Sequence, residues 1–446
     1  MSSLLLSLLF LAAGAAETQD TPRPNLLVVV TDDQRFDQLG AAGHPVLQTP
    51  VMDDLARRGV RFENAFVTTP ICAASRATMM TGRREGRHGY TFGKPSMGEQ
   101  LAQESYFARL RGAGYRTGFV GKWGVRFEKG LRGGLFDSCK LPGQPYRVEG
   151  KPHLTDRIAG HAVDFLREDS AAPFCLTVSF WAPHAEDGHP DQYLPPEDLS
   201  ELYADAEVPQ PPLRLAGYEA LPDFLKNSLG RRRWGWRFDT REKQIQRTKD
   251  YWRMISGVDR ALGRIVDTLE EEGLAEDTVI VFISDNGYFL GERGLAGKWL
   301  IYEESIRVPL IVVDPRLPEA RRGTTRAEMA LNLDLAPTLL DLAGVAAPDG
   351  YEGRSLVPLL RGETPEWRTD FLVEHLFDHA EIPQSVGVRD RQFVYARYHQ
   401  QEPPFEQLFF LGSDPHQLLD LARDPVFAEA LERMRARCDT LLAAGP

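Results

Sequence analysis

Residues 26–31 read Leu-Leu-Val-Val-Val-Thr, and Asp32-Asp33 follows them directly. An uninterrupted apolar and β-branched run of this length, with turn chemistry after it, is typical of a strand that is buried on both faces. Such strands occur in mostly parallel sheets that are covered by helices on both sides. The stretch therefore predicts a central strand that ends on two carboxylates.

Strand and helix patterns alternate along the chain. Similar strand-like runs lie at 117–120, 174–180, 278–284 and 308–313, and helical patterns lie at 50–58, 97–112, 154–168 and 241–273. This alternation predicts an α/β fold with a large, mostly parallel sheet and helices on both faces.

Polar residues follow several of these strand-like runs. They are Asp32-Asp33, Gly121-Lys122, Ala182-Pro183-His184 and Asp285-Asn286. Ligands of open α/β sheets bind beyond the carboxyl ends of the strands. We therefore expect these polar residues to share one rim of the sheet.

Residues 188–240 interrupt the alternation. They are rich in proline and aromatic residues and include Arg231-Arg232-Arg233-Trp234-Gly235-Trp236-Arg237. The composition predicts a long ordered excursion over the rim. The arginine cluster fits either a solvated face or a subsite for anionic groups of a polymeric substrate.

The pattern changes again after about residue 365. Short extended segments at 371–375, 385–389, 393–398 and 407–410 precede a helical pattern at 425–442. They predict a small antiparallel sheet with a helix packed on it. We divide the chain accordingly into a catalytic domain at 17–364 and a C-terminal subdomain at 365–446.

The N-terminus predicts export. The apolar run from Leu4 to Ala13 is too short to span a bilayer, and Gly14-Ala15-Ala16-Glu17 suits cleavage by signal peptidase. No Lys or Arg precedes the run, so a disordered apolar tail is the alternative. No later apolar run reaches the roughly 20 residues of a membrane helix. We expect a signal peptide at 1–16, no membrane anchor, and a secreted or periplasmic protein.

Composition narrows the class of function. The 446 residues are 42% hydrophobic and 26% charged, which is typical of a globular protein with a large buried core. The formal net charge of −12 argues against a nucleic-acid partner, because affinity for phosphates comes from Lys and Arg. Four cysteines in this length do not make a disulfide framework, and at most one disulfide is expected.

The segment Cys72-Ala73-Ala74-Ser75-Arg76, which runs on to Thr81-Gly82, resembles the modification signature of the type I sulfatases. This family belongs to the alkaline phosphatase-like superfamily. Further segments similar to the family follow in its order from Asn25 to about Asp424, and they include NLLVVVTDDQRFD, GYRTGFVGKWG, TVIVFISDNG, GKWLIYEESIRVPLIV and LNLDLAPTLLDLAGV. The resemblance thus covers almost the whole chain.

The resemblance implies a specific chemistry. Cys72 would be oxidised by a formylglycine-generating maturation enzyme, and the two hydroxyls of the hydrated aldehyde would attack sulfur and later expel sulfate. One divalent cation would be bound by Asp32, Asp33, Asp285 and Asn286 and would contact residue 72. These hard oxygen donors favour Ca²⁺ over Mg²⁺ or Mn²⁺.

The other polar positions acquire expected roles from the same resemblance. Arg76 would support the metal ligands and the formylglycine from one helical turn away. Lys122 and Lys298 would contact the sulfate oxygens. His184 would act as the general acid at the leaving oxygen, with Lys298 as a possible partner.

Two positions differ from the family pattern. The family continues Gly-Lys-Trp with a histidine that takes a proton from the second hydroxyl, whereas this chain has Gly124. His88, His189 and Lys122 are candidate replacements. The second position is Ala74, where oxygen-dependent maturation systems prefer proline, so the route of maturation stays open between aerobic and radical-based systems.

We therefore expect a sulfuric ester hydrolase that acts on a sulfated carbohydrate or another sulfate ester. The enzymatic alternative is a phosphonate or phosphate ester hydrolase of the same superfamily, because its cation and nucleophile serve either tetrahedral anion. A catalytically impaired, secreted glycan-binding protein is the non-enzymatic alternative, and Gly124 suggests it.

Overall fold

Strand β1 (Asn25–Asp32) lies in the middle of an eight-stranded sheet, as the opening stretch predicts. The computed structural model describes residues 23–212 and 216–444, so the predicted signal peptide at 1–16 lies outside the described residues. The strand order is β11-β2-β10-β7-β1-β6-β4-β5. The other members are β2 (Val60–Phe62), β4 (Arg116–Gly121), β5 (Ser138–Lys140), β6 (Phe174–Pro183), β7 (Thr278–Ser284), β10 (Leu310–Val313) and β11 (Thr324–Arg326).

The sheet is mostly parallel. β1 pairs in parallel with β6 and β7, and β4 pairs in parallel with β5 and β6. β10 is antiparallel to both of its neighbours, β2 and β7. The parallel strands place their carboxyl ends at one edge of the sheet, which is where the predicted polar residues lie.

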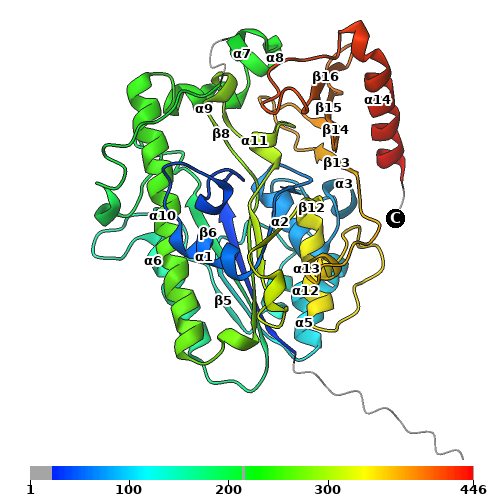
Figure 1. Cartoon of the computed structure of the whole chain (residues 1–446). Helices are drawn as coiled ribbons and strands as arrows, with labels where there is room; N and C mark the ends of the chain where they lie inside the picture. The colour runs from blue at the N-terminus through cyan, green and yellow to red at the C-terminus, as the bar shows by residue number, and fades with distance from the viewer. Residues whose placement is uncertain (1–22, 213–215, 445–446) are drawn as a thin grey trace, which may run out of the picture.

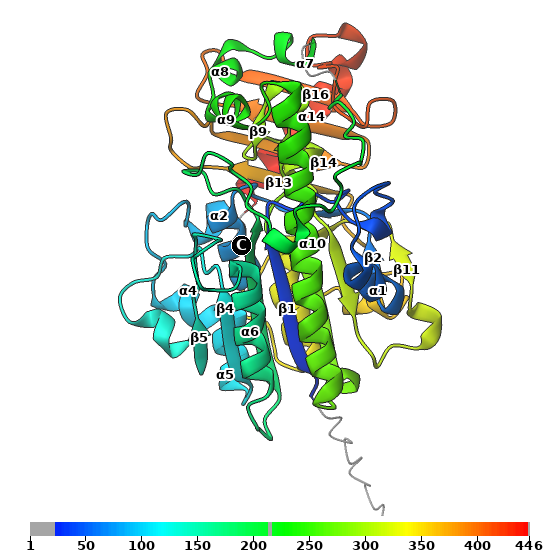
Figure 2. The ribbon, with the colours of Figure 1, turned by 90° about the vertical axis from the view of Figure 1, so that its left-hand side faces the viewer.

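Helices cover both faces of the sheet (Figure 2). The alternating side chains of β1 contact different cores, since Leu26, Val28 and Val30 pack on one face and Leu27 and Val29 on the other. The second face is covered by α1 (Pro50–Arg58), α6 (Leu154–Leu166) and α10 (Arg241–Glu271). The first face is covered by α2 (Cys72–Thr81), α5 (Tyr106–Gly112) and α12 (Leu335–Leu342).

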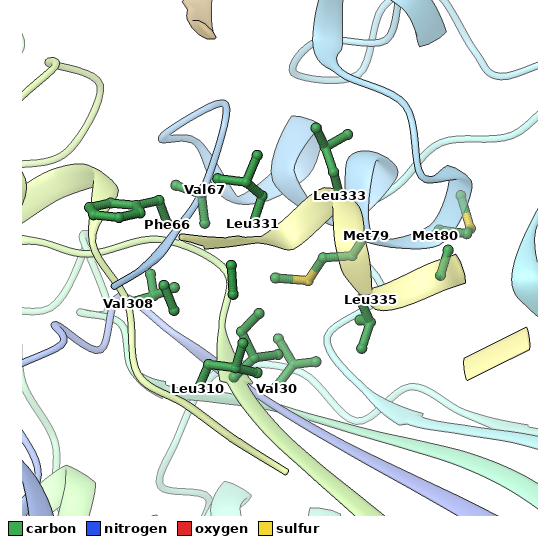
Figure 3. Close-up of a cluster of buried hydrophobic side chains, with 14 of the residues drawn as sticks. Val30, Phe66, Val67, Met79, Met80, Val308, Leu310, Leu331, Leu333 and Leu335 are labelled. Carbon is green, nitrogen blue, oxygen red and sulfur yellow. The ribbon is translucent and has the colours of Figure 1, made fainter. Parts of the chain in front are cut away.

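Helix α2 is fixed against the sheet by its buried apolar side (Figure 3). Met79 and Met80 of α2 lie in the same cluster as Val30 of β1, Leu310 of β10 and Leu335 of α12. Complete burial of such a side chain stabilises the fold by about 1.5–3 kcal/mol. A short parallel pair, β3 (Ala65–Phe66) and β12 (Ala330–Leu331), contributes Phe66 and Leu331 to the same cluster. This packing holds the first residue of α2 near the strand ends.

The predicted helix at 97–112 is wrong as a single element. The structure has α4 (Glu99–Glu104) and α5, separated by Ser105 in an extended conformation. The Ser105 hydroxyl accepts a hydrogen bond from the backbone N–H of Ala108 and thereby caps α5. Such a serine cap offers the backbone an alternative to continued helix.

The excursion at 188–240 is partly helical. It contains α7 (Ala216–Glu219), α8 (Asp223–Lys226) and α9 (Leu229–Arg237), which lie near the C-terminal sheet (Figure 1). Helix α9 is joined to the C-terminal region by a hydrogen bond from Leu229 N–H to the carbonyl of Glu381, at 2.8 Å. The excursion thus connects the two sheets.

The C-terminal region forms a second sheet with a helix on it, as predicted. The antiparallel order is β13 (Asp370–His375), β14 (Ser385–Asp390), β15 (Phe393–Tyr398) and β16 (Phe405–Phe410), and α14 (Ala428–Ala443) packs on this sheet. The remaining α-helices and strands are α3 (Glu85–His88), α11 (Glu303–Ile306), α13 (Val357–Leu360), β8 (Phe289–Leu290) and β9 (Ala296–Gly297), and short 3-10 helices occur between the elements. Within residues 23–212 and 216–444, none of the helices is both long and apolar enough to cross a membrane.

Candidate active site

Cys72 is the first residue of α2 and is only 5% exposed. Ile71 before it is extended, so the helix begins where the chain turns in from the loop. The helix ends at Gly82, whose left-handed conformation lets its N–H bond the carbonyl of Thr78. Arg76 lies one turn along α2 and is also buried.

The predicted carboxylates come together at the ends of two neighbouring strands. Thr31 of β1 pairs with Ser284 of β7, so the residues that follow each strand lie side by side. Asp33 N–H donates to Asp285 Oδ1 at 3.3 Å, and Asn286 Nδ2 donates to Asp33 Oδ1 at 2.5 Å. Asp33 has a left-handed backbone with φ of 69°, a conformation that is uncommon for residues other than glycine.

These residues fit a divalent cation. One ligand atom from each of Asp32, Cys72 and Asp285 lies within 4.8 Å of the others, and Asp32, Asp33 and His184 form a second such group. Among the described residues, Asp32 Oδ1, Asp33 Oδ2 and Asn286 Oδ1 are buried without a hydrogen-bond partner. Leaving such an atom unpaired costs about 1–3 kcal/mol, and coordination to a hard cation would remove that cost.

Arg76 ties α2 to the carboxylates and to the neighbouring strands. Its Nε and Nη2 atoms both contact Asp285 Oδ2 at 2.8 Å, and Nη2 lies 3.6 Å from Asp32 Oδ2. Its Nη1 donates to the carbonyl of Lys122 at 2.8 Å and also to the Ser179 hydroxyl. One guanidinium thus links the last residue of β1, and the residues that follow β4 and β7, with the start of α2.

Two lysines lie on the same carboxylates. Lys122 follows β4 and its Nζ donates to Asp32 Oδ2. Lys298 follows β9, and its Nζ lies 2.5 Å from Asp33 Oδ1 and 3.6 Å from Asp32 Oδ1. With Arg76, three buried cations therefore face three buried carboxylates around Cys72. A further cation at these carboxylates would create an excess of positive charge that suits an anionic substrate.

His184 lies at the end of β6 with a defined orientation. Its Nδ1 donates to the carbonyl of Ala185 at 2.5 Å, and its Nε2 lies 3.8 Å from Asp33 Oδ2. Because a carbonyl can only accept, Nδ1 carries the proton and Nε2 faces the cluster.

The pKa shifts reflect this crowded arrangement. Burial would raise the pKa of Asp32, but Lys122, His184, Lys298 and Arg76 outweigh burial and hold it well below its ordinary value. Burial and the charge of Asp32 raise the pKa of Asp285 to about 6. Burial lowers the pKa of His184 to about 4, against the opposing effect of Asp33 and Asp32. Burial would lower the pKa of Lys298, yet Asp33 and its neighbours raise it.

Gly124 is explained by its surroundings. Its φ is 72°, and a Cβ atom at this position would lie 2.9 Å from Arg76 Cδ. A histidine here would therefore be strained and would displace the arginine that holds Asp285. The backbone carbonyl of Gly124 accepts a hydrogen bond from the hydroxyl of Tyr90, at 3.2 Å.

The three candidate replacements for a base at Gly124 differ in position. His88 accepts from Tyr90 N–H through Nδ1 and bonds the Thr78 hydroxyl through Nε2, so both of its ring nitrogens are engaged. His189 accepts from Asp191 N–H in the loop after β6, and its side chain is 39% exposed. Lys122 contacts the carboxylate cluster directly, so the geometry favours it among the three.

Sequence reasoning missed two residues that organise the site. Ser179 of β6 accepts from Arg76 and donates to the carbonyl of Lys122 at 2.9 Å, but a serine inside an apolar strand carries no pattern that would reveal this. Asp187, three residues after His184, binds Arg233 and Arg237 of α9. The sequence did offer one indication of a role for Asp187, namely its position in the loop that directly follows the predicted rim residue His184.

Known proteins are similar to this chain over most of its length. The sequence model of the Sulfatase family matches residues 24–345, and the model described as N-sulphoglucosamine sulphohydrolase, C-terminal, matches residues 291–443. An N-acetylglucosamine-6-O-sulfatase of Bacteroides thetaiotaomicron is 27% identical, covering 94% of this chain and 86% of the relative.

Solved structures share the fold. A protein in complex with its substrate D-glucosamine-2-N,6-O-disulfate superposes with a TM-score of 0.82 at 24% identity, covering 94% of this chain and 97% of the other. The phosphonate monoester hydrolase of Agrobacterium radiobacter superposes with a TM-score of 0.81, also at 24% identity, covering 94% and 96%. The chain therefore belongs to the sulfatase family, within the alkaline phosphatase-like superfamily, and is an enzyme that hydrolyses sulfate esters.

Proposed function

We propose that the protein removes sulfate from a sulfated carbohydrate with a formylglycine formed from Cys72 and a bound Ca²⁺ ion. The observation that carries this proposal is the position of Cys72. It shares a 4.8 Å cluster with Asp32 and Asp285, and three buried cations surround the cluster. A cysteine in such surroundings is placed for chemistry on an anion rather than for packing.

Asp32, Asp33, Asp285 and Asn286 would hold the cation. Three of them have a buried oxygen without a hydrogen-bond partner, and these hard oxygen donors, with no imidazole or thiolate among the four, favour Ca²⁺ over Mg²⁺ or Mn²⁺. When bound, the ion would supply positive charge that favours an ionised hydroxyl on residue 72 and offsets the charge of the sulfate. Burial of all four residues keeps water from competing for these positions.

The maturation of Cys72 would supply the nucleophile. The formylglycine hydrate carries two hydroxyls, one to attack sulfur and one whose deprotonation expels sulfate. Arg76 orients this position, because it lies one turn along the same helix and is fixed by Asp285. Ala74 is fully buried and places only a methyl group near residue 72. We propose a formylglycine-generating maturation enzyme as the partner that converts Cys72.

Lys122 and Lys298 would bind the sulfate oxygens. Both are protonated, because Asp32 and Asp33 respectively raise the pKa of each lysine against the effect of burial. Fixed cations in a water-poor site stabilise the charge of the pentacoordinate transition state. Nε2 of His184 faces the same space, but its pKa of about 4 leaves Nε2 without a proton at neutral pH. The proton for the leaving oxygen would therefore come from the protonated Lys298, which contacts Asp33 as His184 does.

The second proton transfer has to differ from the family pattern, because Gly124 has no side chain. Lys122 is the candidate that touches the cluster, but its raised pKa keeps it protonated at neutral pH, so it has no lone pair to accept the proton. We therefore expect release of sulfate to limit turnover.

A carbohydrate substrate is supported by the relatives. An N-acetylglucosamine-6-O-sulfatase and a Formosa agariphila ulvan-active sulfatase are among the proteins that this chain resembles. The predicted signal peptide at 1–16 suits a secreted or periplasmic enzyme that meets polysaccharides outside the cytoplasm.

The rival substrate is a phosphonate or phosphate ester, since a phosphonate monoester hydrolase shares the fold. Rates on 4-nitrophenyl sulfate and on the matched 4-nitrophenyl phenylphosphonate separate the two, with the protein matured in a host that converts Cys72. We expect the sulfate ester to be the faster substrate and Cys72→Ala to abolish its hydrolysis. A faster phosphonate reaction would replace the sulfatase proposal.

A further inference from the structure

Helix α9 and the loop after His184 face each other beside the site. Helix α9 packs against β9, the strand that leads into Lys298. The loop at 184–192 is closed on itself by a hydrogen bond from Glu186 N–H to the carbonyl of Gln192, at 2.7 Å. Gln192 Oε1 in turn accepts from Arg237 Nε at 2.9 Å. The loop and the helix therefore form one connected wall.

Asp187 lies between two arginines of that wall. One of its carboxylate oxygens binds Arg233 and the other binds Arg237. Arg237 is fully buried, and its remaining donors are used by Tyr288 and Gln192. One carboxylate therefore balances two guanidinium groups, and this group of three side chains retains one positive charge.

Arg233 retains unused hydrogen-bonding capacity. Its Nε and Nη1 atoms have no hydrogen-bond partner within the described ranges 23–212 and 216–444, and its side chain is 12% exposed. The neighbouring arginines are used differently, since Arg231 donates to the carbonyl of Gly294 and Arg232 binds Glu381. Donors left unpaired at low exposure are costly, so a ligand is a natural partner for them.

The position of Arg233 connects it to the reacting centre. Its guanidinium carbon lies 4.9 Å from the centre of the Trp299 ring, and Trp299 packs with Ile71 and Ala74 on either side of Cys72. Trp299 also follows Lys298 directly. Burial would raise the pKa of Asp187, but the charges of Arg233 and Arg237 lower it. His184 and Lys298 of the site also lower this pKa, so charges of the site act on the carboxylate that binds Arg233.

We propose that Arg233 binds a second anionic group, a sulfate or a carboxylate, on the same substrate molecule that carries the scissile sulfate. The Trp299 ring would hold the guanidinium in place, and Asp187 would fix one of its edges. This inference rests on the proposed function and adds a substrate class to it, namely saccharides with at least two acidic groups close together. Arg233 is thus a specificity residue that contacts the substrate beside the reacting atoms.

Binding to protein that cannot turn over tests the proposal. Calorimetry with the calcium-loaded Cys72→Ala protein compares three probes: N-acetyl-D-glucosamine-6-O-sulfate, D-glucosamine-2-N,6-O-disulfate, and a singly sulfated disaccharide that contains a uronic acid. We expect at least one of the two dianionic probes to bind about tenfold more tightly than the singly charged sugar. The probe that shows the preference identifies the second group as sulfate or carboxylate.

Variants assign the preference to Arg233. Arg233→Gln should reduce it to less than about twofold, while Arg233→Lys, which keeps the charge, should retain part of it. Arg232→Gln is the matched control, because it removes one charge from the adjacent, exposed position of the same helix and should leave the preference intact. Circular dichroism establishes whether each variant is folded. If Arg233→Gln does not fold, the reduced preference of Arg233→Lys relative to the parent protein decides the test.

Two results would overturn the proposal: equal binding of all three probes by the parent protein, or an undiminished preference in Arg233→Gln. Failure of the proposed function looks different. In that case the protein with a converted Cys72 releases no sulfate from an aryl sulfate, whatever the calorimetry shows.

Discussion

Arg76 contacts a single oxygen of Asp285 through two nitrogens, Nε and Nη2, each at 2.8 Å. This buried pair joins the helix that begins at Cys72 to the end of β7. Its geometry sets the distance between the nucleophile position and the carboxylates of the predicted metal site.

Replacing Arg76 should therefore damage both stability and catalysis. Arg76→Ala leaves Asp285 buried without its partner, which costs about 3–5 kcal/mol for pairs of this kind. Arg76→Lys keeps the charge but offers one nitrogen instead of a planar fork, so it should fold better and still lose turnover. Thermal unfolding together with kcat on an aryl sulfate checks both effects. A normal kcat in Arg76→Lys would show that the fork is not needed.

Removal of the cation should abolish activity and lower thermal stability. Chelation leaves Asp32 Oδ1, Asp33 Oδ2 and Asn286 Oδ1 buried without a partner, and a ligand that binds only the native state raises its stability. Adding back Ca²⁺ should restore activity and the unfolding temperature more fully than Mg²⁺ does. Asp33→Asn should weaken calcium binding in calorimetry. Full activity after exhaustive chelation would contradict the assignment of these residues.

Restoring the family's histidine at position 124 should not help this protein. Gly124 has φ of 72° and lies against Arg76, so any side chain there is strained by about 1–2 kcal/mol and displaces the arginine. Gly124→Ala and Gly124→His should both lower the unfolding temperature and kcat. Gly160→Ala, in the interior of α6 with open space around it, is the control and should be neutral or stabilising. A higher kcat in Gly124→His would show that Arg76 can move aside.

Glu85 makes stability depend on pH. Burial raises its pKa from 4.5 to about 7, so the folded protein holds a proton there that the unfolded chain has lost. The contribution of protonated Glu85 to the free energy of unfolding is complete below pH 4.5. It is lost as the pH rises through 7, and the loss amounts to about 3 kcal/mol. Glu85→Gln should raise the unfolding temperature at pH 8 and not at pH 4.5.

The exposed Glu201→Gln provides the baseline for that comparison. It should change the unfolding temperature little at either pH, because its charge is solvated in both states. Equal effects of the two substitutions at pH 8 would mean that Glu85 is ionised in the folded protein without penalty.

The strand ends account for what could be predicted of the site. Asp32 and Asp285 could be placed together from sequence because both follow buried runs of a parallel sheet, and the structure pairs β1 with β7. Lys298 could not be placed that way, since it follows a two-residue strand with no pattern, and only the family resemblance indicated it. The partners of Asp187 come from a helix 46 residues away along the chain, a separation that no local pattern reveals.

The fold, like the site, has features that the sequence predicts and features that it does not. The long apolar runs and the C-terminal strands were predictable, because their length and alternation report burial directly. Periodicity gave no indication of the direction of β10 or of the three-residue strands β2, β5 and β11. The break at Ser105 was missed, because the apolar period continues through it while the serine hydroxyl caps a new helix.

The fraction of converted Cys72, measured by peptide mass spectrometry alongside the rate of 4-nitrophenyl sulfate hydrolysis, tests the central claim most directly. Preparations from hosts with and without a maturation system provide a range of converted fractions. The account predicts that the rate rises in proportion to the converted fraction and is zero when Cys72 remains a thiol. Undiminished hydrolysis by fully unconverted protein, or none by fully converted protein, would contradict it.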